Sequence, residues 1–482
     1  MRKRFIIAAA GFTTLTGIAI AAATIEPQKG GASLLDVRRW SPDWSEQDSK
    51  NLETPLKLRA PKSDDLLVSA PDPTPAPLPE GAVGAHAYQY DSRVFSHPSE
   101  HPTAIGLVRR GRVLRTDQRT SGPGCNSGAW YALRSKGYVC SRDGFAISRG
   151  EHQVPAIAPL PDLDSALPYR YGKARTNEAL RFYEIPTAAE LEEIAAAQQS
   201  GSRPPDVVER QMDGVFLLAL DSEETRDDSL FYRTVRGRYV KAEDIELKPT
   251  PAMHGELLGS SDKCMTLPLA FVYGDEGAQL YARDKGTVRS VGKAEKHVRL
   301  TVAREARWNG RDMVVREDGI ALPREHTRIA RRIKRPEDIP QATKWIHVNL
   351  DEQTLVAYEG DRPVFATLVS SGKGEDFATP TGIYQIREKH ISVTMNGPDP
   401  DAGYYEVEEV PWTQYYHDSF ALHGAYWHND FGKTRSHGCT NISPIDARWL
   451  FYWTDDDLPQ AWHALRKLHG NHVYFTRDLP PQ

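Results

Sequence analysis

The stretch SHGCTN, residues 436–441, sets a hydroxyl, an imidazole, a thiol and an amide next to one another. A cysteine attacks a carbonyl carbon as the thiolate, and its ordinary pKa of about 8.5 keeps it mostly protonated at neutral pH. A nearby imidazole can take that proton and later return it to a leaving amine. The consecutive N–H groups of Gly438 and Cys439 can donate to a developing oxyanion, because glycine permits a close approach. The stretch therefore suits acyl transfer through Cys439.

Two histidines are candidates for the base. The wider stretch HDSFALHGAYWHNDFGKTRSHGCT holds histidines at positions 417, 423, 428 and 437. His437 stands two residues before the thiol and His423 sixteen residues before it. A third group usually orients such a base. The residues alone leave the choice between His423 and His437 open.

Three other states of Cys439 are weighed against catalysis. Zinc sites favour regular pairs such as CxxC, whereas this single cysteine lies among unevenly spaced histidines, so no metal site is expected. A disulfide with Cys264 is a second alternative, and an inert buried thiol is a third. We expect Cys439 to be unpaired and partly exposed in a cleft, with no cofactor.

The elements around the motif must position these groups. Residues 345–373 alternate apolar and polar side chains over three predicted strands, and residues 379–390 add another. Residues 443–454 have an acid in the first turn and apolar residues at helical spacing, and residues 472–477 suit a closing strand. The pattern predicts one mostly-β domain with one or two helices over residues 341–480.

The motif resembles a known family signature. HGAYWHNDFGKTRSHGCTN is similar to that of the L,D-transpeptidase catalytic (YkuD) domain, in which a His-Gly pair and a loop precede [Ser/Thr]-His-Gly-Cys-x-Asn. The resemblance covers residues 344–477 and implies a β-sandwich of that type. Thr440 departs from the apolar residue usual in the family, but it keeps a β-branched shape.

The resemblance implies a role for each fixed position. Cys439 would be the nucleophile and His423 the general base and acid, oriented by the Gly424 carbonyl. The N–H groups of Gly438 and Cys439 would form the oxyanion hole. Support within the motif would come from His437, Ser436 and Asn441. Residues expected to shape or line the cleft are Trp427, His428, Tyr415, Met395, Trp412 and His417.

The family reaction is remodelling of peptidoglycan stem peptides. The thiol would attack the third residue of a tetrapeptide stem, release D-alanine, and pass the acyl group to an amine. The product would be a 3-3 cross-link or an attached protein or amino acid, and attack by water would make the enzyme an L,D-carboxypeptidase. A non-catalytic cell-wall-binding protein and a zinc amidase are further alternatives. A papain-like peptidase is disfavoured, because its cysteine precedes its histidine.

The N-terminus predicts export. Arg2, Lys3 and Arg4 precede an uncharged apolar stretch over residues 5–25, with small residues suited to cleavage at its end. Residues 1–25 are therefore a signal peptide or an uncleaved inner-membrane anchor, and the protein belongs to the periplasm or cell envelope. Residues 26–84 include a proline-rich stretch and are predicted as a disordered linker.

The middle of the chain is predicted to hold small β domains. Residues 85–150 resemble bacterial SH3-like domains, and residues 151–340 predict one or two more β domains with a surface helix at 187–199. Such modules suggest a cell-wall polymer as partner. A disulfide between Cys125 and Cys140 is expected in an exported chain.

The net charge of −5 gives no reason to expect nucleic acid as a partner. Scattered basic pairs such as Arg109-Arg110 and Arg331-Arg332 are interpreted as solvated faces.

Overall fold

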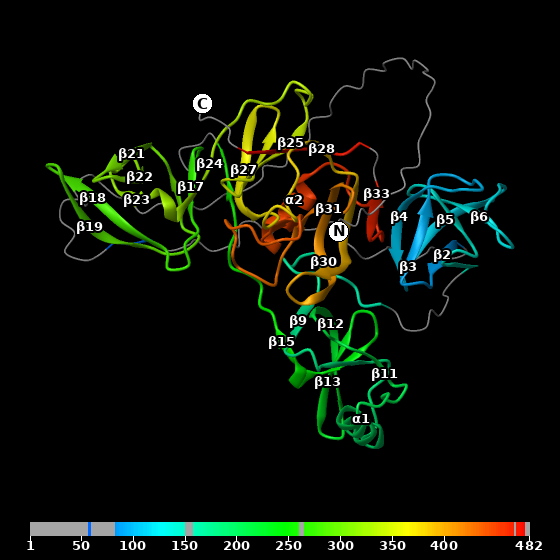
Figure 1. Cartoon of the computed structure of the whole chain (residues 1–482). Helices are drawn as coiled ribbons and strands as arrows, with labels where there is room; N and C mark the ends of the chain where they lie inside the picture. Colours follow the sequence, from blue (N-terminus) through cyan, green and yellow to red (C-terminus); the bar gives the residue numbers. More distant parts are fainter. Residues whose placement is uncertain (1–55, 59–81, 150–157, 260–264, 467–468, 478–482) are drawn as a thin grey trace, which may run out of the picture. The chain divides into compact units, whose positions relative to one another are not determined.

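Most elements of the chain are short strands, formed where runs of β-branched and aromatic residues end at glycine, asparagine or aspartate turns (Figure 1). The computed structural model describes residues 56–58 (backbone only), 82–149, 158–259, 265–466 and 469–477. The chain divides into the units Met1–Arg38 and Arg39–Gln482, and every described residue belongs to the second. The predictions for residues 1–25, for most of the linker and for Cys264 lie outside the described residues.

The first region spans residues 82–149. Its strands are β2 (Val83–Ala87), β3 (Asp91–Phe95), β4 (Ala104–Arg109), β5 (Val113–Thr120), β6 (Trp130–Leu133), β7 (Tyr138–Cys140) and β8 (Phe145–Arg149). They pair antiparallel in the order β4-β3-β7-β6-β5-β2-β8. Cys125 and Cys140, the pair expected from the sequence, are joined in a disulfide. The SH3-like assignment stays a prediction.

The second region spans residues 170–247. Its strands are β9 (Arg170–Ala174), β10 (Leu180–Phe182), β11 (Val208–Gln211), β12 (Val215–Arg226), β13 (Ser229–Thr234), β14 (Tyr239–Lys241) and β15 (Ile245–Leu247), with a 3-10 turn η2 (Ala242–Asp244). The helix expected at 187–199 is α1 (Ala188–Ser200). Thr187 and Glu190 form a capping box at its start, and Gly201 ends it in the left-handed conformation.

The third region spans residues 256–330. Its strands are β16 (Glu256–Leu257), β17 (Leu269–Val272), β18 (Ala278–Asp284), β19 (Thr287–Ala294), β20 (Arg299–Thr301), β21 (Arg304–Trp308), β22 (Arg311–Val315), β23 (Ala321–Pro323) and β24 (Thr327–Ala330), with a 3-10 turn η3 (Arg324–His326). One sheet has the order β20-β17-β24, and a second has the order β1-β19-β18-β23-β22-β21, where β1 (Leu56–Leu58) runs parallel to β19.

The C-terminal region carries the motif. Its strands are β25 (Lys344–Asn349), β26 (Thr354–Glu359), β27 (Arg362–Ser370), β28 (Gly382–Gln385), β29 (Glu388–Asp399), β30 (Gly403–His417), β31 (Phe420–Gly424), β32 (Thr440–Ile442), β33 (Ala464–Arg466) and β34 (His472–Thr476). Helix α2 (Pro444–Trp453) has Asp446 in its first turn, as the pattern predicts, and the structure adds Ser443 as its N-cap. The mostly-β architecture predicted for the chain is confirmed.

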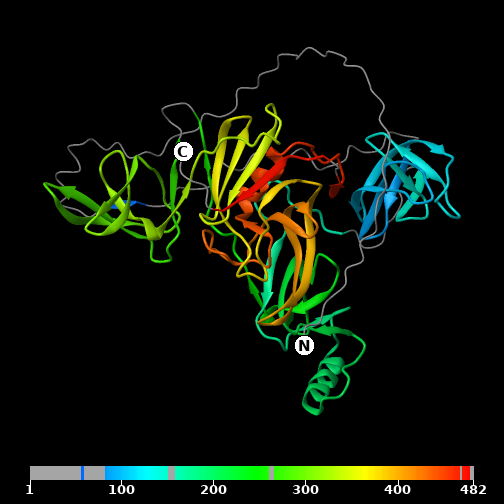
Figure 2. The same cartoon turned by 45° about the horizontal axis from the view of Figure 1, so that its top comes forward.

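The sheet of this region sets out the site. β29, β30 and β31 are antiparallel neighbours, β31 pairs parallel with β32, and β32 pairs antiparallel with β27. Helix α2 buries most of its residues against these strands, in a core that includes Leu422, Ile442 and Leu450. Figure 2 shows the long β29–β30 hairpin from a second side. The helix and sheet therefore hold both halves of the motif on one rigid frame.

The earlier regions add strands to this frame. β12 runs parallel to β30, β33 pairs with both β29 and β4, and β16 pairs with β27. Among the described residues, no helix is long and apolar enough to cross a membrane.

Candidate active site

The pairing of β31 with β32 brings the two halves of the motif together. The parallel register sets Leu422 opposite Thr440 and His423 opposite Asn441. Successive side chains alternate between the two faces of a strand, and directly opposed residues share a face. Cys439, which directly precedes β32, lies alongside Ala421 and receives a hydrogen bond from the Ala421 N–H. The thiol and the His423 imidazole therefore belong to the same face of adjacent strands.

His423 is buried, and its ring is fixed by its own neighbour. His423 is only 3% exposed, and its Nδ1 lies 3.2 Å from the Gly424 carbonyl oxygen. A carbonyl can only accept, so Nδ1 carries the proton and Nε2 keeps its lone pair. Burial lowers the pKa of His423 to about 4, against a smaller opposing effect of the Gly424 carbonyl. The Trp427 ring lies 5.7 Å from the imidazole, centroid to centroid. At neutral pH the His423 side chain is therefore a neutral imidazole.

Cys439 is a free thiol of intermediate exposure. Its Sγ donates to the Ser419 carbonyl oxygen at 3.5 Å. Burial raises the pKa of the Cys439 thiol to about 11, although the Ala421 N–H opposes the shift. A thiol of raised pKa beside an imidazole of lowered pKa is a neutral pair at rest. Neither group carries its charged form at neutral pH in this state.

Gly438 is required by its backbone and its surroundings. Its φ is +119°, and a Cβ there would lie 2.6 Å from a ring carbon of Phe420. Its carbonyl accepts from Thr379 Oγ1 at 2.7 Å. Its N–H donates to Ser436 Oγ at 3.1 Å, while the Ser436 hydroxyl donates to the Cys439 carbonyl. Ser436 thus braces the nucleophile loop, and an oxyanion would have to displace its hydroxyl to use the Gly438 N–H.

His437, the second candidate base, is engaged elsewhere. Its Nε2 lies 3.0 Å from Asp399 Oδ2, and its ring stacks on Tyr405 at a centroid separation of 5.0 Å and an angle of 2°. The Phe377 ring meets it edge-on at 4.7 Å. Backbone N–H groups of the hairpin turn and His437 together lower the pKa of Asp399, although burial opposes them. His437 thus joins the loop that carries Cys439 to the β29–β30 hairpin, and its supporting role stays a prediction.

His428 and Asn441 form a buried polar pair. The Asn441 amide group nearest the ring lies 2.9 Å from His428 Nε2. On the other side of the ring, His428 Nδ1 accepts a hydrogen bond from the Asp430 N–H at 3.2 Å. Burial lowers the pKa of His428 to about 4, so the ring is neutral and carries one proton. Since Nδ1 accepts, that proton must be on Nε2. The structure sets Asn441 Nδ2 against it, which would place two donors together, so the amide must be turned over to present its oxygen there. His428 therefore fixes the orientation of the Asn441 amide.

The loop between the motif halves is also held from outside. Arg328 Nε, from β24, donates to the Gly432 carbonyl at 2.8 Å, and Lys433 Nζ lies 2.6 Å from Asp275 Oδ2. Ser370 Oγ donates to the Asp430 carbonyl at 3.0 Å. The third region thus helps to place the loop that carries Trp427 and His428.

The remaining expected cleft residues divide into two groups. Tyr415 lies opposite Ala421 in the sheet, and burial together with nearby Cys439 raises its pKa well above the ordinary value. The His417 ring stacks against Phe420 at 6.0 Å. Met395 packs in an apolar cluster with Tyr426 and Trp427. Trp412, by contrast, is fully buried in the core and donates its Nε1–H to the Ala166 carbonyl at 2.6 Å, so its prediction as a cleft residue is wrong.

The sequence reasoning did not find Asp399, Tyr405, Phe377 and Tyr416, which lie around the nucleophile loop. Tyr416 is buried, and its pKa is raised by burial and then by Cys439. None of the four has a fixed spacing from the motif. A run of aromatic residues at 404–405 and 415–416 was the available signal.

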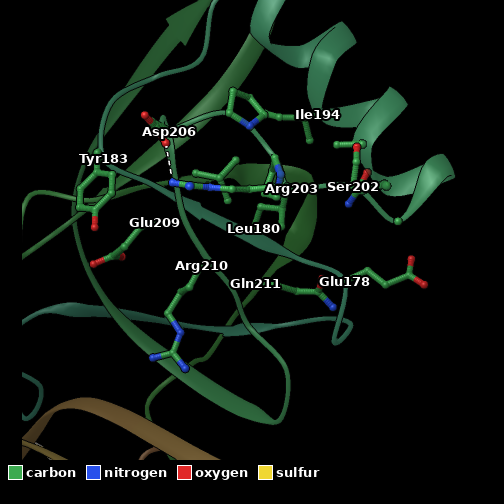
Figure 3. Close-up of a pocket in the computed structure, with 16 residues that line it drawn as sticks. Glu178, Leu180, Tyr183, Ile194, Ser202, Arg203, Asp206, Glu209, Arg210 and Gln211 are labelled. Carbon is green, nitrogen blue, oxygen red and sulfur yellow. Dashed lines mark hydrogen bonds and ion pairs between the residues drawn. The ribbon is translucent and has the colours of Figure 1, made fainter.

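A separate hollow of about 890 Å³ lies in the second region (Figure 3). It is formed by α1, β10, β11 and the loop after α1, and its charged side chains include the ion pair of Arg203 and Asp206 at 2.8 Å. Its lining residues fall between positions 178 and 211, so it is not part of the Cys439 site. In the described part of the chain, no group of three or more His, Cys, Asp or Glu side chains is placed to hold a metal.

Comparisons with known proteins bear on the C-terminal region. Residues 343–460 match the L,D-transpeptidase catalytic domain family, YkuD. A curated Bacillus subtilis (strain 168) protein named "Putative L,D-transpeptidase YciB" is 29% identical over 128 residues, which cover 24% of this chain and 62% of that protein. The chain thus spans less than two thirds of this relative.

Two solved structures are similar to the chain over a part of its length. A crystal structure of an Enterococcus faecium L,D-transpeptidase is 19% identical, covering 31% of this chain and 55% of that one, with a TM-score of 0.24. An NMR structure of the catalytic domain from the E. faecium enzyme is 22% identical, covering 28% and 98%, with a TM-score of 0.22. The family match over residues 343–460 agrees with the motif resemblance, so this part of the chain is similar to the YkuD L,D-transpeptidase catalytic domain.

Proposed function

We propose that the protein is an exported cysteine L,D-transpeptidase that acts on peptidoglycan stem peptides through a thioester at Cys439. The observation that carries the proposal is the parallel pairing of β31 with β32, which puts His423 and Cys439 on one face of adjacent strands. The tautomer of His423 supports it, because Nε2 is left free to accept a proton.

The first half-reaction forms the thioester. His423 Nε2 takes the proton from Cys439 Sγ as the sulfur attacks the carbonyl carbon of the third stem residue. The carbonyl oxygen becomes an oxyanion, which accepts from the Cys439 N–H and, once it displaces the Ser436 hydroxyl, from the Gly438 N–H. The imidazolium then gives its proton to the departing amine, and D-alanine leaves. Concerted transfer fits a neutral resting pair, since a preformed thiolate is disfavoured by the raised thiol pKa.

The second half-reaction transfers the acyl group. An acceptor amine loses a proton to His423 as its nitrogen attacks the thioester carbonyl, and the proton returns to the sulfur as the C–S bond breaks. An amine on a neighbouring stem gives a 3-3 cross-link, and an amine on a protein or amino acid gives an attached product. Attack by water gives a carboxypeptidase product instead.

The location and partners follow from the proposed substrate. Peptidoglycan lies outside the inner membrane, which agrees with the positively charged, apolar N-terminal segment of the sequence. We assign the protein to the periplasm or cell envelope, with wall polymer as a partner of the regions before the catalytic domain.

The test is incubation of the full chain with a labelled disaccharide tetrapeptide, with products identified by mass spectrometry. We expect free D-alanine and a cross-linked dimer, both lost in Cys439→Ala and both retained in His97→Ala, a matched surface control in the first region. Unchanged D-alanine release by Cys439→Ala would refute the nucleophile assignment. D-alanine release without a dimer would instead assign water, or an added amine, as the acceptor.

A further inference from the structure

The tip of the β29–β30 hairpin rests on the nucleophile loop. Asp399, at the end of β29, has Oδ2 3.0 Å from His437 Nε2, and Tyr405, near the start of β30, stacks on the same ring. His437 stands two residues before Cys439 in the chain. The position of the hairpin tip is therefore tied to the position of the loop that carries the thiol.

The hairpin is bent between its tip and its base. Within β30, Glu409 and Trp412 have φ values of +49° and +54°, and the register with β29 shifts between Val393 and Met395. Residues other than glycine in this conformation cost on the order of 1–3 kcal/mol each and persist only where their surroundings hold them. The direction of the tip thus depends on the contacts made at the bend.

Glu409, at the bend, is held by the first region. Its side chain is fully buried, and Oε2 lies 2.6 Å from Arg109 Nη2. The Tyr90 hydroxyl donates to its other oxygen at 2.8 Å, and Ser392 Oγ donates to Oε2 at 2.6 Å. Arg109 is only 5% exposed, so its interpretation as part of a solvated basic face is wrong. Its pairing with a carboxylate 300 positions away removes it from water.

Two further carboxylates are held by the second region. Arg181 Nη1 donates to Glu406 at 2.7 Å and to Glu408 at 3.1 Å, and its own side chain is 9% exposed. Glu408 also accepts the Ala219 N–H at 3.2 Å. Next to these contacts, β12 pairs with β30 in parallel over Val215–Leu217. The second region therefore contacts β30 both through strand pairing with β12 and through the ion pairs of Arg181.

These contacts fix geometry more than they add stability. A buried ion pair is close to neutral for stability when it replaces apolar packing, but breaking one by removing a partner is costly. We propose that Arg109 and Arg181 are positioning residues that hold the β29–β30 hairpin so that its tip stays on the nucleophile loop. Regions far from the motif in sequence would then set the rate of the proposed transpeptidase, on which this inference rests.

The test uses variants of the full chain. Arg181→Met removes an arginine partner from Glu406, Glu408 and Glu209 and can fail to fold. It is therefore paired with a variant that also carries Glu406→Gln and Glu408→Gln, in which Glu209 keeps Arg238 and the partly exposed Arg210 loses its contact with Glu406. Arg181→Lys keeps the charge as a rescue. Arg203→Met, in the same region but in an exposed ion pair, is the matched control.

Two readouts separate positioning from general stability. Hydrogen exchange of peptides covering residues 397–405 reports the tip, and kcat and KM for D-alanine release report the site. We expect the neutralised triple variant to lose about tenfold or more in kcat and in tip protection, with KM nearly unchanged. Arg181→Lys should recover most of both losses, and Arg203→Met should match the wild type.

Two outcomes would overturn the positioning role, and a third shows how its failure can be told apart from failure of the proposed function. A folded triple variant with wild-type kcat and tip protection would overturn it. So would a loss of activity that follows the melting temperature while the tip stays protected. If the wild type releases no D-alanine, the proposed function fails, and unchanged tip exchange in the triple variant would then overturn the positioning role by itself.

Discussion

The two histidines of the motif are held in opposite ways. His423 is oriented by the carbonyl of the next residue and enclosed by a tryptophan four positions later. His437 is held by Asp399 and Tyr405, which come from a hairpin whose bend is fixed by the first and second regions. The position of the His423 imidazole is fixed by residues close to it in sequence, and that of the His437 imidazole by residues from distant regions. The difference agrees with the roles proposed for them, proton transfer by His423 and placement of the loop by His437.

The largest expected effect is on the locally held histidine. His423→Gln should lower kcat/KM for D-alanine release by roughly 10²–10⁴-fold, because the general base is removed. The pH dependence governed by its pKa should disappear with it. A loss smaller than that of His437→Gln would reverse the assignment of base and support. Circular dichroism of both variants controls for folding.

Reactivity of the thiol sharpens the same comparison. Because burial raises the pKa of Cys439 to about 11, alkylation by iodoacetamide should rise about tenfold per pH unit from pH 7 to pH 9. His423→Gln should leave this profile almost unchanged, since no ion pair exists at rest. A plateau near neutral pH would indicate a preformed thiolate and would contradict the neutral pair. Cys439→Ala gives the background.

A smaller effect is expected on the histidine held by the fold. His437→Gln and Asp399→Asn should each lower kcat by about tenfold, consistent with misplacement of a loop and not with loss of a base. The double variant should lose little more than either single variant, because the two residues act through one contact. Additive losses, measured with the same tetrapeptide, would separate the roles of His437 and Asp399.

A separate effect, on stability and not on rate, is expected at the bend. Burial raises the pKa of Glu408 to about 7, against lowering by Arg181, Arg236 and the Ala219 N–H, and Glu406 raises it further. The folded protein therefore binds this proton more tightly than the unfolded chain does. The stability gained from it is complete below about pH 4.5 and is lost as the pH rises through 7.

Glu408→Gln should cancel that dependence. The unfolding free energy of the wild type relative to Glu408→Gln should fall by about 3 kcal/mol between pH 4.5 and pH 7.5. Thermal melts of the two proteins in parallel buffers measure it, and carboxylates common to both drop out of the difference. If the difference in unfolding free energy between the two proteins does not change with pH, the prediction is wrong, because Glu408 then does not titrate in the folded protein within this range.

The sequence predicted best what is encoded nearby. Cys439 and His423 belong to one continuous motif, Asp446 follows a capping serine, and Cys125 and Cys140 close a short loop. Asp399, Arg109 and Arg181 carried no such signal, because each acquires its partner only when separate regions pack together. Trp412 was misplaced for a related reason, since its left-handed backbone in mid-strand turns it into the core. The alternation of apolar and polar residues along a strand does not show where an irregularity of this kind reverses the direction of a side chain.

The parallel pairing of β12 with β30 has a practical consequence. Over Tyr405–Val407, the backbone of β30 hydrogen-bonds to β29 on one side and is covered by β12 on the other. A fragment cut at the start of the family match would lack β12 and would bare this row of amides and carbonyls. Exposed strand edges of this kind pair with other chains and promote aggregation. Expression of the catalytic part should therefore retain residues from the second region onward.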